Sequence, residues 1–290
     1  MASGIFTRSQ KCIMRLRAST AGRLPTSLKR ALVTLFLITL SYAIASEAAN
    51  LLLPHRVFVG VHYIEDVDFI PTYSSLAEEF QFLAVSGILQ KSIIVSTVRV
   101  LEGFGLGSLI GISLGILSAW TRRLEYSLDP WMNFFRFTPA LALLPLYSLW
   151  FGTGEISKIL LIVTGVAVVT WLGTDHGIRE TPQTLVRAAL ILGAGRWLLL
   201  RKILLPSALQ HIFSSLRVAL ALAWVTLIVA ELMNPRIPSL GYLLALASAF
   251  TKVQTILVGI TVIGSLVLTS DIIAITLYNR ATSWMRRRDG

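Results

Sequence analysis

Charged residues are scarce in this chain. They make up 14% of its 290 residues, whereas soluble domains carry about 25%. Hydrophobic residues reach 54%, and apolar runs of roughly 20 residues, the length that a helix needs to cross a bilayer, recur along the chain. Because lipid offers no partner for backbone N–H and C=O groups, each run is expected to be helical. The sequence therefore predicts an all-α, polytopic transmembrane helical bundle.

Residues for thiol, metal and hydrolytic chemistry are also few. The one cysteine, Cys12, lies in a polar basic segment, which excludes a disulfide framework and a thiolate metal site. The histidines are scattered, so no metal site is predicted. The chain lacks a G-x-x-x-x-G-K-[ST] phosphate loop, an H-E-x-x-H pair and a serine nucleophile elbow. We expect neither an enzymatic activity nor a cofactor of its own.

Acidic residues are outnumbered by basic ones, 15 to 26, which gives a net charge of +11. Nucleic acid binding would require the basic residues to share one exposed face. They cluster instead in short segments beside apolar runs, as the positive-inside rule describes for membrane proteins. We expect membrane lipid around the chain and no nucleic acid partner.

The N-terminal third divides into three segments. Residues 1–30 are basic without any acidic residue and predict a cytoplasmic tail. Residues 31–54 are apolar and predict the first transmembrane helix, although Ala43 and Ala45 also have the spacing of a signal-peptide cleavage site. In either case residues 55–91, which are rich in Asp and Glu, begin outside the cell.

Residues 92–278 form the predicted core transmembrane domain. Its spans are expected at 92–120, 131–151, 156–173, 208–233 and 256–278, with a basic cytoplasmic loop at 174–207 and an external loop at 234–255. The basic tail, 279–290, returns to the cytoplasm. The chain is thus expected to have about six spans with both termini inside.

Two patterns concern packing and shape. Gly103, Gly107, Gly111 and Gly115 recur every four residues and predict a small-residue ridge for close helix packing, with a moving gate as the alternative. Pro139 and Pro145 interrupt the third span. Irregular backbone at membrane depth is tolerated mainly beside protein or a cavity, so this span is a candidate for lining a pore.

The loop at 174–207 carries the most informative motif. Ala and Gly residues precede an I-x-L-P sequence at a fixed distance. Small residues, a turning glycine and a proline at the next span indicate two short helices, the first capped by Thr181 or Thr184. Here the chain resembles the permeases of bacterial ATP-binding-cassette (ABC) importers, through Arg187, Ala188, Ala189, Gly193, Ile203, Leu205 and Pro206. Arg187 stands where the family has Glu.

The resemblance extends from about residue 83 to the C-terminus. It is to the permease branch for nitrate, bicarbonate, taurine and other sulfonates, and the residues that carry it are 96–99, 136–145, 150–158, 216–217 and 223–232. It implies the type I importer fold in the bacterial inner membrane. The loop would be the coupling helix that docks on the ATPase, which binds ATP and Mg²⁺. The implied partners are a second permease copy, as a homodimer, two ABC ATPase subunits and an external solute-binding protein.

Ionisable residues within spans are costly and tend to face protein or water. Arg99, Arg217 and Asp271 are interpreted as internally paired or as reaching a helix end. Candidates for the translocation path, chosen with the branch motifs, are Arg136, Pro139, Pro145, Trp224 and Glu231.

None of these residues identifies the solute. A small anion is expected, with a pyrimidine or other heterocyclic vitamin precursor as the alternative. A secondary transporter without an ATPase, or a membrane scaffold, would leave the 187–206 motif unexplained.

Overall fold

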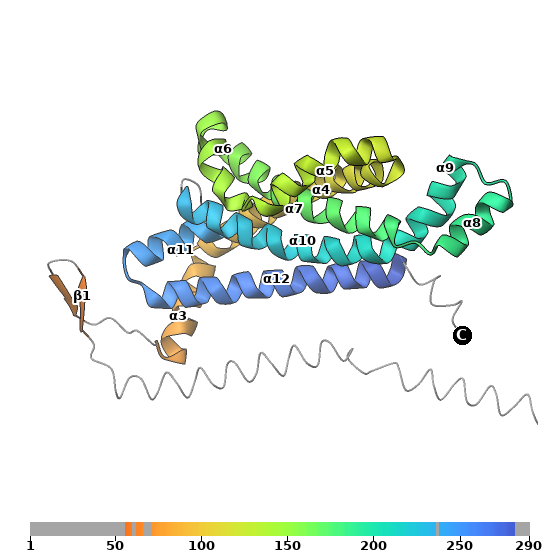
Figure 1. Ribbon diagram of the computed structural model, residues 1–290. Coiled ribbons are helices and arrows are strands. Elements are labelled where there is room, and N and C mark those ends of the chain that lie inside the picture. The colour runs from red at the N-terminus through yellow and green to blue at the C-terminus, as the bar shows by residue number, and fades with distance from the viewer. Residues whose placement is uncertain (1–55, 60–61, 66–70, 236–237, 282–290) are drawn as a thin grey trace, which may run out of the picture. The chain divides into compact units, whose positions relative to one another are not determined.

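The computed structural model describes residues 56–59, 62–65, 71–235 and 238–281 (Figure 1). The predicted tail at 1–30, the first span at 31–54 and the end of the C-terminal tail lie outside the described residues. The strands β1 (Arg56–Val59) and β2 (His62–Glu65) form an antiparallel hairpin in a unit that ends at Tyr73. The second unit, from Ser74 onward, is helical where it is described.

The helices follow the predicted order. They are α3 (Tyr73–Val85), α4 (Ile88–Trp120), α5 (Arg122–Phe137), a 3-10 turn η1 (Ala140–Leu143), α6 (Leu144–Phe151), α7 (Glu155–Arg179), α8 (Gln183–Ile191), α9 (Arg196–Leu199), a π-helical turn η2 (Leu200–Leu204), α10 (Leu205–Met233), α11 (Leu240–Ala249) and α12 (Val253–Ala281). Within the described residues, four helical segments are long and apolar enough to cross a membrane on their own: α4, α7, 196–233 and α12.

The third predicted span, 131–151, differs most from the structure. Its helix begins at Arg122, directly after α4, and the segments on either side of Thr138 and Pro139 meet at 93°. The residue before a proline avoids the helical conformation, and Thr138 is extended with φ −82° and ψ 119°. Pro145 is tolerated in the first turn of α6, where its missing N–H has no intrahelical partner to lose.

The glycine ridge of α4 packs against α7. A Cβ atom added at Gly103 would lie 2.6 Å from Ile162 Cβ, one at Gly107 2.8 Å from Val166 Cβ, and one at Gly115 2.5 Å from Thr174 Cβ. Positions on both helices increase together, so α4 and α7 run parallel. The chain must therefore return across the bundle between them, and the bent α5–α6 segment supplies that fifth crossing.

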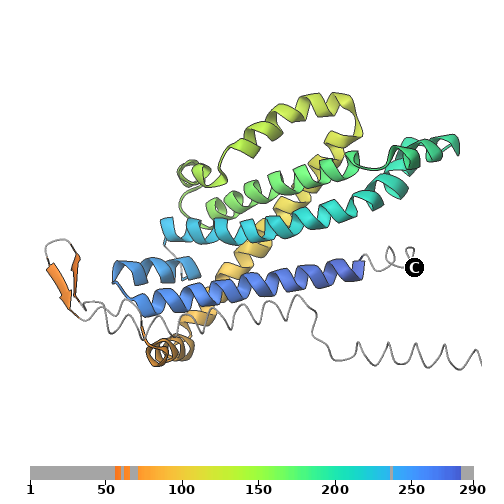
Figure 2. The same cartoon turned by 60° about the horizontal axis from the view of Figure 1, so that its bottom comes forward.

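Helix α10 packs antiparallel to α7. Gly173 faces Ser215 and Gly177 faces His211, so positions on α10 fall as those on α7 rise. Around this contact lies a core of fully buried side chains, among them Ile162, Val166, Trp224 and Leu227. Figure 2 shows α7, α10 and α12 side by side, with α4 crossing them obliquely.

The remaining boundaries need one correction. The spans expected at 92–120, 156–173, 208–233 and 256–278 correspond to α4, α7, α10 and α12. Helix α7, however, continues to Arg179, so residues 174–179 of the predicted loop belong to the span. The loop predicted to be external, 234–255, contains α11, which packs on α10 and α12 with Leu240, Leu243 and Ala247 buried.

Candidate functional site

The loop between α7 and α10 folds as two short helices joined at a glycine. Helix α8 ends at Ile191, and Gly193 has φ +81°, a left-handed conformation that glycine adopts at little cost. The turn is closed by hydrogen bonds from Gly193 N to Leu190 O at 3.0 Å and from Ala194 N to Ala189 O at 2.9 Å. The conformation expected of Gly193 is confirmed.

The predicted threonine cap of α8 is wrong. Pro182 occupies the cap position, and its carbonyl accepts from Leu185 N at 3.0 Å. Thr181 is buried, and its hydroxyl has no hydrogen-bond partner among the described residues. Pro182 has the extended backbone of an N-cap, with φ −55° and ψ 125°, but it offers no side-chain acceptor.

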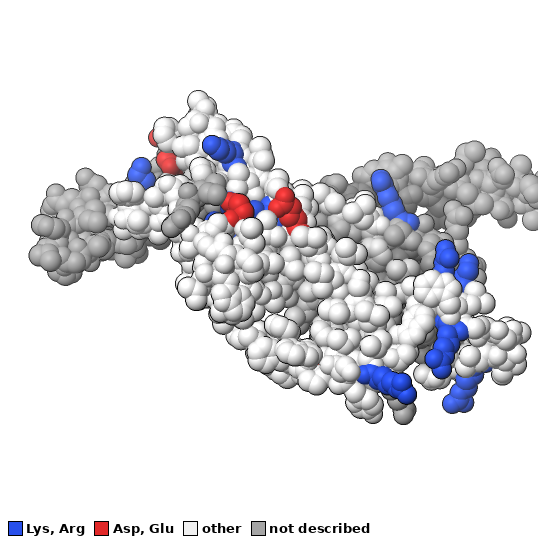
Figure 3. Space-filling view, turned by 90° about the horizontal axis from the view of Figure 1, so that it is seen from above, with Lys and Arg blue, Asp and Glu red and all other residues white. Residues whose placement is uncertain are grey.

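The surface of this loop is both apolar and basic. Ile191 and Leu192 are each 86% exposed, and further exposed apolar side chains are Leu185, Leu190, Trp197 and Leu198. The basic side chains Arg187, Arg196, Arg201 and Lys202 are exposed around them. Figure 3 shows Lys and Arg gathered at this end on the visible face. Ala188 is exposed and Ala189 buried, so the small pair lies at the boundary of α8 with the protein.

The second half of the motif joins the loop to α10. Ile203, Leu205 and Pro206 are half-buried, and Pro206 lies in the first turn of α10. The π-helical turn η2 precedes it directly. A proline removes a backbone donor, and a local π turn is one way for a continuous helix to accommodate that loss.

Polar side chains hold the start of this loop to the bundle. Arg179 Nε donates to Asp175 Oδ2 at 2.8 Å, and its Nη1 donates to Glu125 Oε1 on α5 at 2.8 Å. Ser118 of α4 donates to the same Asp175 at 2.7 Å. The last turn of α7 is therefore connected to α4 and α5 immediately before α8.

The end of the loop has its own contacts. His211 Nε2 of α10 lies 3.1 Å from Glu180 Oε2. The rings of Trp120, at the end of α4, and Trp197 of α9 have centroids 6.0 Å apart. These contacts connect α9 to α4, and the residues just before α8 to α10.

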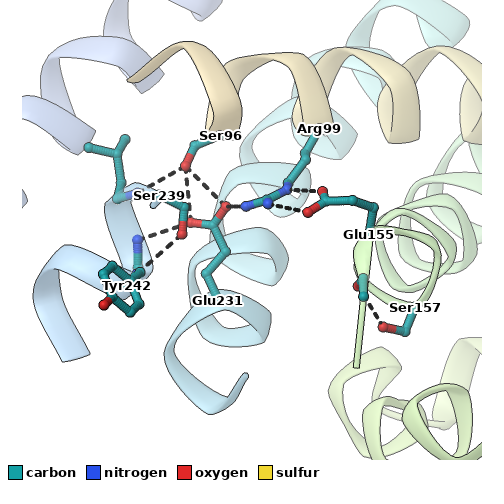
Figure 4. Close-up of polar contacts among 10 residues, drawn as sticks. Ser96, Arg99, Glu155, Ser157, Glu231, Ser239 and Tyr242 are labelled. Carbon is teal, nitrogen blue, oxygen red and sulfur yellow. Dashed lines mark hydrogen bonds and ion pairs between the residues drawn. The ribbon is translucent and has the colours of Figure 1, made fainter. Parts of the chain in front are cut away.

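A second polar cluster lies at the other end of the same helices (Figure 4). Glu231 of α10 is fully buried and accepts from Arg99 Nη1 at 2.5 Å and from Ser96 Oγ at 3.0 Å. Arg99 also donates from Nη2 to Glu155 Oε1 at 2.5 Å and from Nε to Glu155 Oε2. The side chains come from α4, α7 and α10. We call these four residues, Ser96, Arg99, Glu155 and Glu231, the buried junction.

The buried junction also positions α11. Gly241 N donates to Glu231 Oε2 at 2.9 Å, and Leu240 N donates to Ser96 Oγ at 3.1 Å. The unpaired N–H groups of a helix start attract negative charge, which suits the Glu231 carboxylate. A Cβ atom at Gly241 would lie 3.0 Å from Ile228 O and collide with Glu231 Cβ, so only glycine allows this approach.

Charges in this region balance. Lys158, one turn after Glu155, is also buried and interacts electrostatically with the junction. Two cations, Arg99 and Lys158, thus face two carboxylates. Buried charges are retained in low-dielectric surroundings when they are paired and hydrogen-bonded. Arg99 and Glu231 fulfil that condition, and Lys158 contributes through its charge.

The five path candidates do not form one open surface. Arg136 on α5, Pro139 just before η1 and Pro145 on α6 are exposed. The Arg136 guanidinium lies 5.7 Å from the Phe137 ring centroid. Trp224 is 1% exposed and donates to Ser270 Oγ at 3.3 Å. Glu231 is bound within the buried junction. The geometry of Trp224 and Glu231 favours positioning of helices over direct contact with a solute.

Sequence reasoning did not assemble the buried junction. The sequence marks Arg99 and Glu231 as ionisable residues in spans, whereas Ser96 and Glu155 belong only to the motif segments 96–99 and 150–158. The partners are separated by 56 and 132 positions along the chain. The signal available was that cations and carboxylates at the same expected depth in different spans should pair.

Comparison with known proteins agrees with this architecture. Residues 107–287 match the family described as binding-protein-dependent transport system inner membrane component. The chain is 33% identical over 221 residues to a putative aliphatic sulfonates transport permease of Bacillus subtilis, covering 76% of this chain and 80% of the relative. It is 32% identical to the taurine transport system permease of Escherichia coli over 74% of this chain and 80% of the relative.

A third sequence relative and a solved structure are also similar to this chain. A bicarbonate transport system permease of Synechococcus elongatus is 31% identical over 67% of both chains. Among solved structures, the inward-facing MetNI methionine ABC transporter matches with a TM-score of 0.60 at 19% identity, covering 67% of this chain and 95% of that one. The structural match supports the fold.

The family match and the sequence relatives also show the role of this chain within a transporter. The chain is a multi-pass inner-membrane subunit without catalytic activity, and ATP is handled by ATPase partners of the complex. This chain belongs to the binding-protein-dependent transport system inner membrane components, the permease subunits of ABC importers.

Proposed function

We propose that this permease imports a small oxyanion and that the α8–α9 loop couples its movement to the ATPase. The observation that carries the coupling role is the loop itself. Its surface is apolar and basic and faces outward, while its two ends are fixed to the bundle through Arg179 and His211. Such a surface suits a docking groove on another protein, since large exposed apolar patches mark interaction sites.

The proposed solute class comes from the relatives. Their names refer to aliphatic sulfonates, taurine and bicarbonate. These solutes share a small oxyanion group, and we propose the same group for this chain. Delivery would be by an external solute-binding protein.

The proposed assembly has two copies of the chain around one path, above two ATPase subunits. The basic α8–α9 end faces the cytoplasm, as the positive-inside rule requires, and both chain termini lie on that side. Arg136, Pro139 and Pro145, all exposed, border the path. Trp224 and Glu231 hold the helices behind it.

The coupling role is tested at two glycines of one loop. Gly193→Val places a β-branched residue at φ +81°, where the left-handed conformation costs an ordinary L-residue about 1–2 kcal/mol and a β-branched one more. Gly195→Val is the matched control, because Gly195 is also exposed but has φ −69° and ψ 162°, which valine accepts.

We expect both variants to insert and to purify normally. Gly193→Val should lose co-purification with the ATPase or solute-stimulated ATP hydrolysis in liposomes, and Gly195→Val should retain both. Wild-type coupling in the Gly193→Val protein would show that this loop does not transmit the ATPase movement.

A further inference from the structure

An ion pair lies between α10 and α12, away from both clusters described above. Arg217 Nε donates to Asp271 Oδ1 at 2.8 Å and Nη2 donates to Oδ2 at 2.9 Å. The contact is therefore bidentate, the geometry in which a guanidinium holds a carboxylate most firmly. The internal pairing expected for these two residues is confirmed.

The pair lies deep within its helices. At 1.5 Å per residue, Arg217 is about 18 Å from the start of α10 and about 24 Å from its end. Asp271 is about 27 Å from the start of α12 and about 15 Å from its end. The hydrocarbon core of a bilayer is about 30 Å thick, and a core centred on these two helices includes both residues.

The pair is nevertheless not covered by this chain's described residues. The side chain of Arg217 is 45% exposed and that of Asp271 is 40% exposed. Both line a hollow of about 450 Å³ together with Ser214, Val218, Ala221 and Leu268. Charged groups at this depth cost about 3 kcal/mol or more each when they face lipid, and they normally face protein or a water-filled cavity.

We propose that this hollow is part of the aqueous translocation path and that Arg217 and Asp271 form a binding station for a small oxyanion within it. The assignment rests on the proposed importer function. The hollow exceeds the volume of a single carboxylate or sulfonate group, and its lining offers small side chains at Ser214 and Ala221 that leave the guanidinium accessible.

The two residues have different roles in this station. A guanidinium carries five N–H donors, and Asp271 engages only the Nε edge and one Nη2 hydrogen. Arg217 lines the hollow, and its remaining donors would hold the oxyanion. Asp271 fixes the guanidinium plane and balances its charge, so that the bound solute is also able to leave.

Water access is tested with single cysteines in the full complex with its ATPase, in a Cys12→Ser background. Leu268→Cys lies in the hollow, and Ile273→Cys lies about 7.5 Å farther along α12 and about 140° around its axis, with exposures of 49% and 55% in the native residues. A thiol reacts as its thiolate, which forms in water and is suppressed in apolar surroundings. With a methanethiosulfonate reagent bearing a sulfonate, Leu268→Cys should react at least about tenfold faster than Ile273→Cys. Equal rates would mean that lipid or a second copy covers this face, and would overturn the proposal.

Solute binding is tested by uptake into proteoliposomes of taurine, ethanesulfonate and bicarbonate. Arg217→Gln removes the charged donor and should raise KM about tenfold or more, the effect of losing a charged hydrogen bond of about 1.5–3 kcal/mol. Asp271→Asn keeps the Arg217 guanidinium as the donor, so KM should stay unchanged or fall. An equal rise in both variants would identify a purely structural clamp and contradict the station. If the wild-type protein takes up none of the three solutes, the oxyanion class of the proposed function fails, while the cysteine rates still decide whether the hollow is aqueous.

Discussion

At the scale of single residues, Glu231 shows how a charge in a span acquires its role from its partners. The carboxylate accepts hydrogen bonds from an arginine, a serine and a backbone N–H. It is fully buried and fixes three helices and the start of α11 at one point. The path role predicted for Glu231 stays a prediction, and the geometry supports a positioning role first.

Replacing Glu231 by Gln should destabilise the protein. Arg99 would lose its buried carboxylate partner, and breaking a buried ion pair on one side typically costs about 3–5 kcal/mol. Glu155→Gln removes the other carboxylate partner of Arg99, but the Glu155 side chain is 42% exposed, so water compensates part of the loss. Thermal unfolding in detergent should therefore show a larger fall in Tm for Glu231→Gln. An equal or smaller fall would contradict the buried junction.

At the scale of helices, the contact of α4 with α7 depends on the absence of side chains. The glycine ridge lets the two backbones approach until an added Cβ at Gly111 would collide with Thr170 and the carbonyl of Ala167. Small residues at helix contacts serve this purpose in membranes, where the hydrophobic effect does not drive helices together. A gate along this contact would have to move two closely meshed helices.

Gly111→Val should separate α4 from α7. Inserting side-chain atoms into a closely packed contact costs about 1–3 kcal/mol. Gly105→Val is the control, because Gly105 lies in the same helix with no atom within 4 Å of its added Cβ. The two variants are compared by their Tm and by their solute-stimulated ATP hydrolysis. Equal stability of the two variants would show that the ridge is not a packing requirement.

At the scale of the whole molecule, the chain should cross the membrane with both termini inside. The parallel direction of α4 and α7 requires a return crossing through α5 and α6, which places the start of α3 and the end of α10 on the same side. The basic α8–α9 loop lies on the other side, where the positive-inside rule places the cytoplasm.

Thiol labelling in intact cells checks this topology. Cysteines introduced at Ser74 and Asn234, each in a Cys12→Ser background, should react with an impermeant reagent added outside. Native Cys12 should react only after permeabilisation. Labelling of Cys12 in intact cells would show that the N-terminus lies outside the cell and would contradict this topology. A purified protein whose mass lacks the first 45 residues or so would favour the signal-peptide alternative.

The amino-acid sequence predicted the spans that are α4, α7, α10 and α12 in the structure, and the two-helix loop between α7 and α10, because these depend on local properties. The third predicted span differs, since its helix begins at Arg122 and bends at Pro139, and the sides of the membrane stay a prediction. A run of apolar residues must be helical in lipid wherever it packs. Likewise Gly193 could be assigned a turn from its place in the motif, and its φ of +81° agrees.

Only the tertiary structure decided which charges meet. Glu231 binds Arg99, 132 positions away, while Arg217 binds Asp271, 54 positions away. Nothing in either segment specifies its partner, since the pairing depends on the rotation and depth of helices that are set by packing elsewhere, such as the glycine ridge. The same holds for exposure: Glu231 and Arg217 are both charged residues in α10, yet the first is sealed among four helical segments and the second opens onto a hollow.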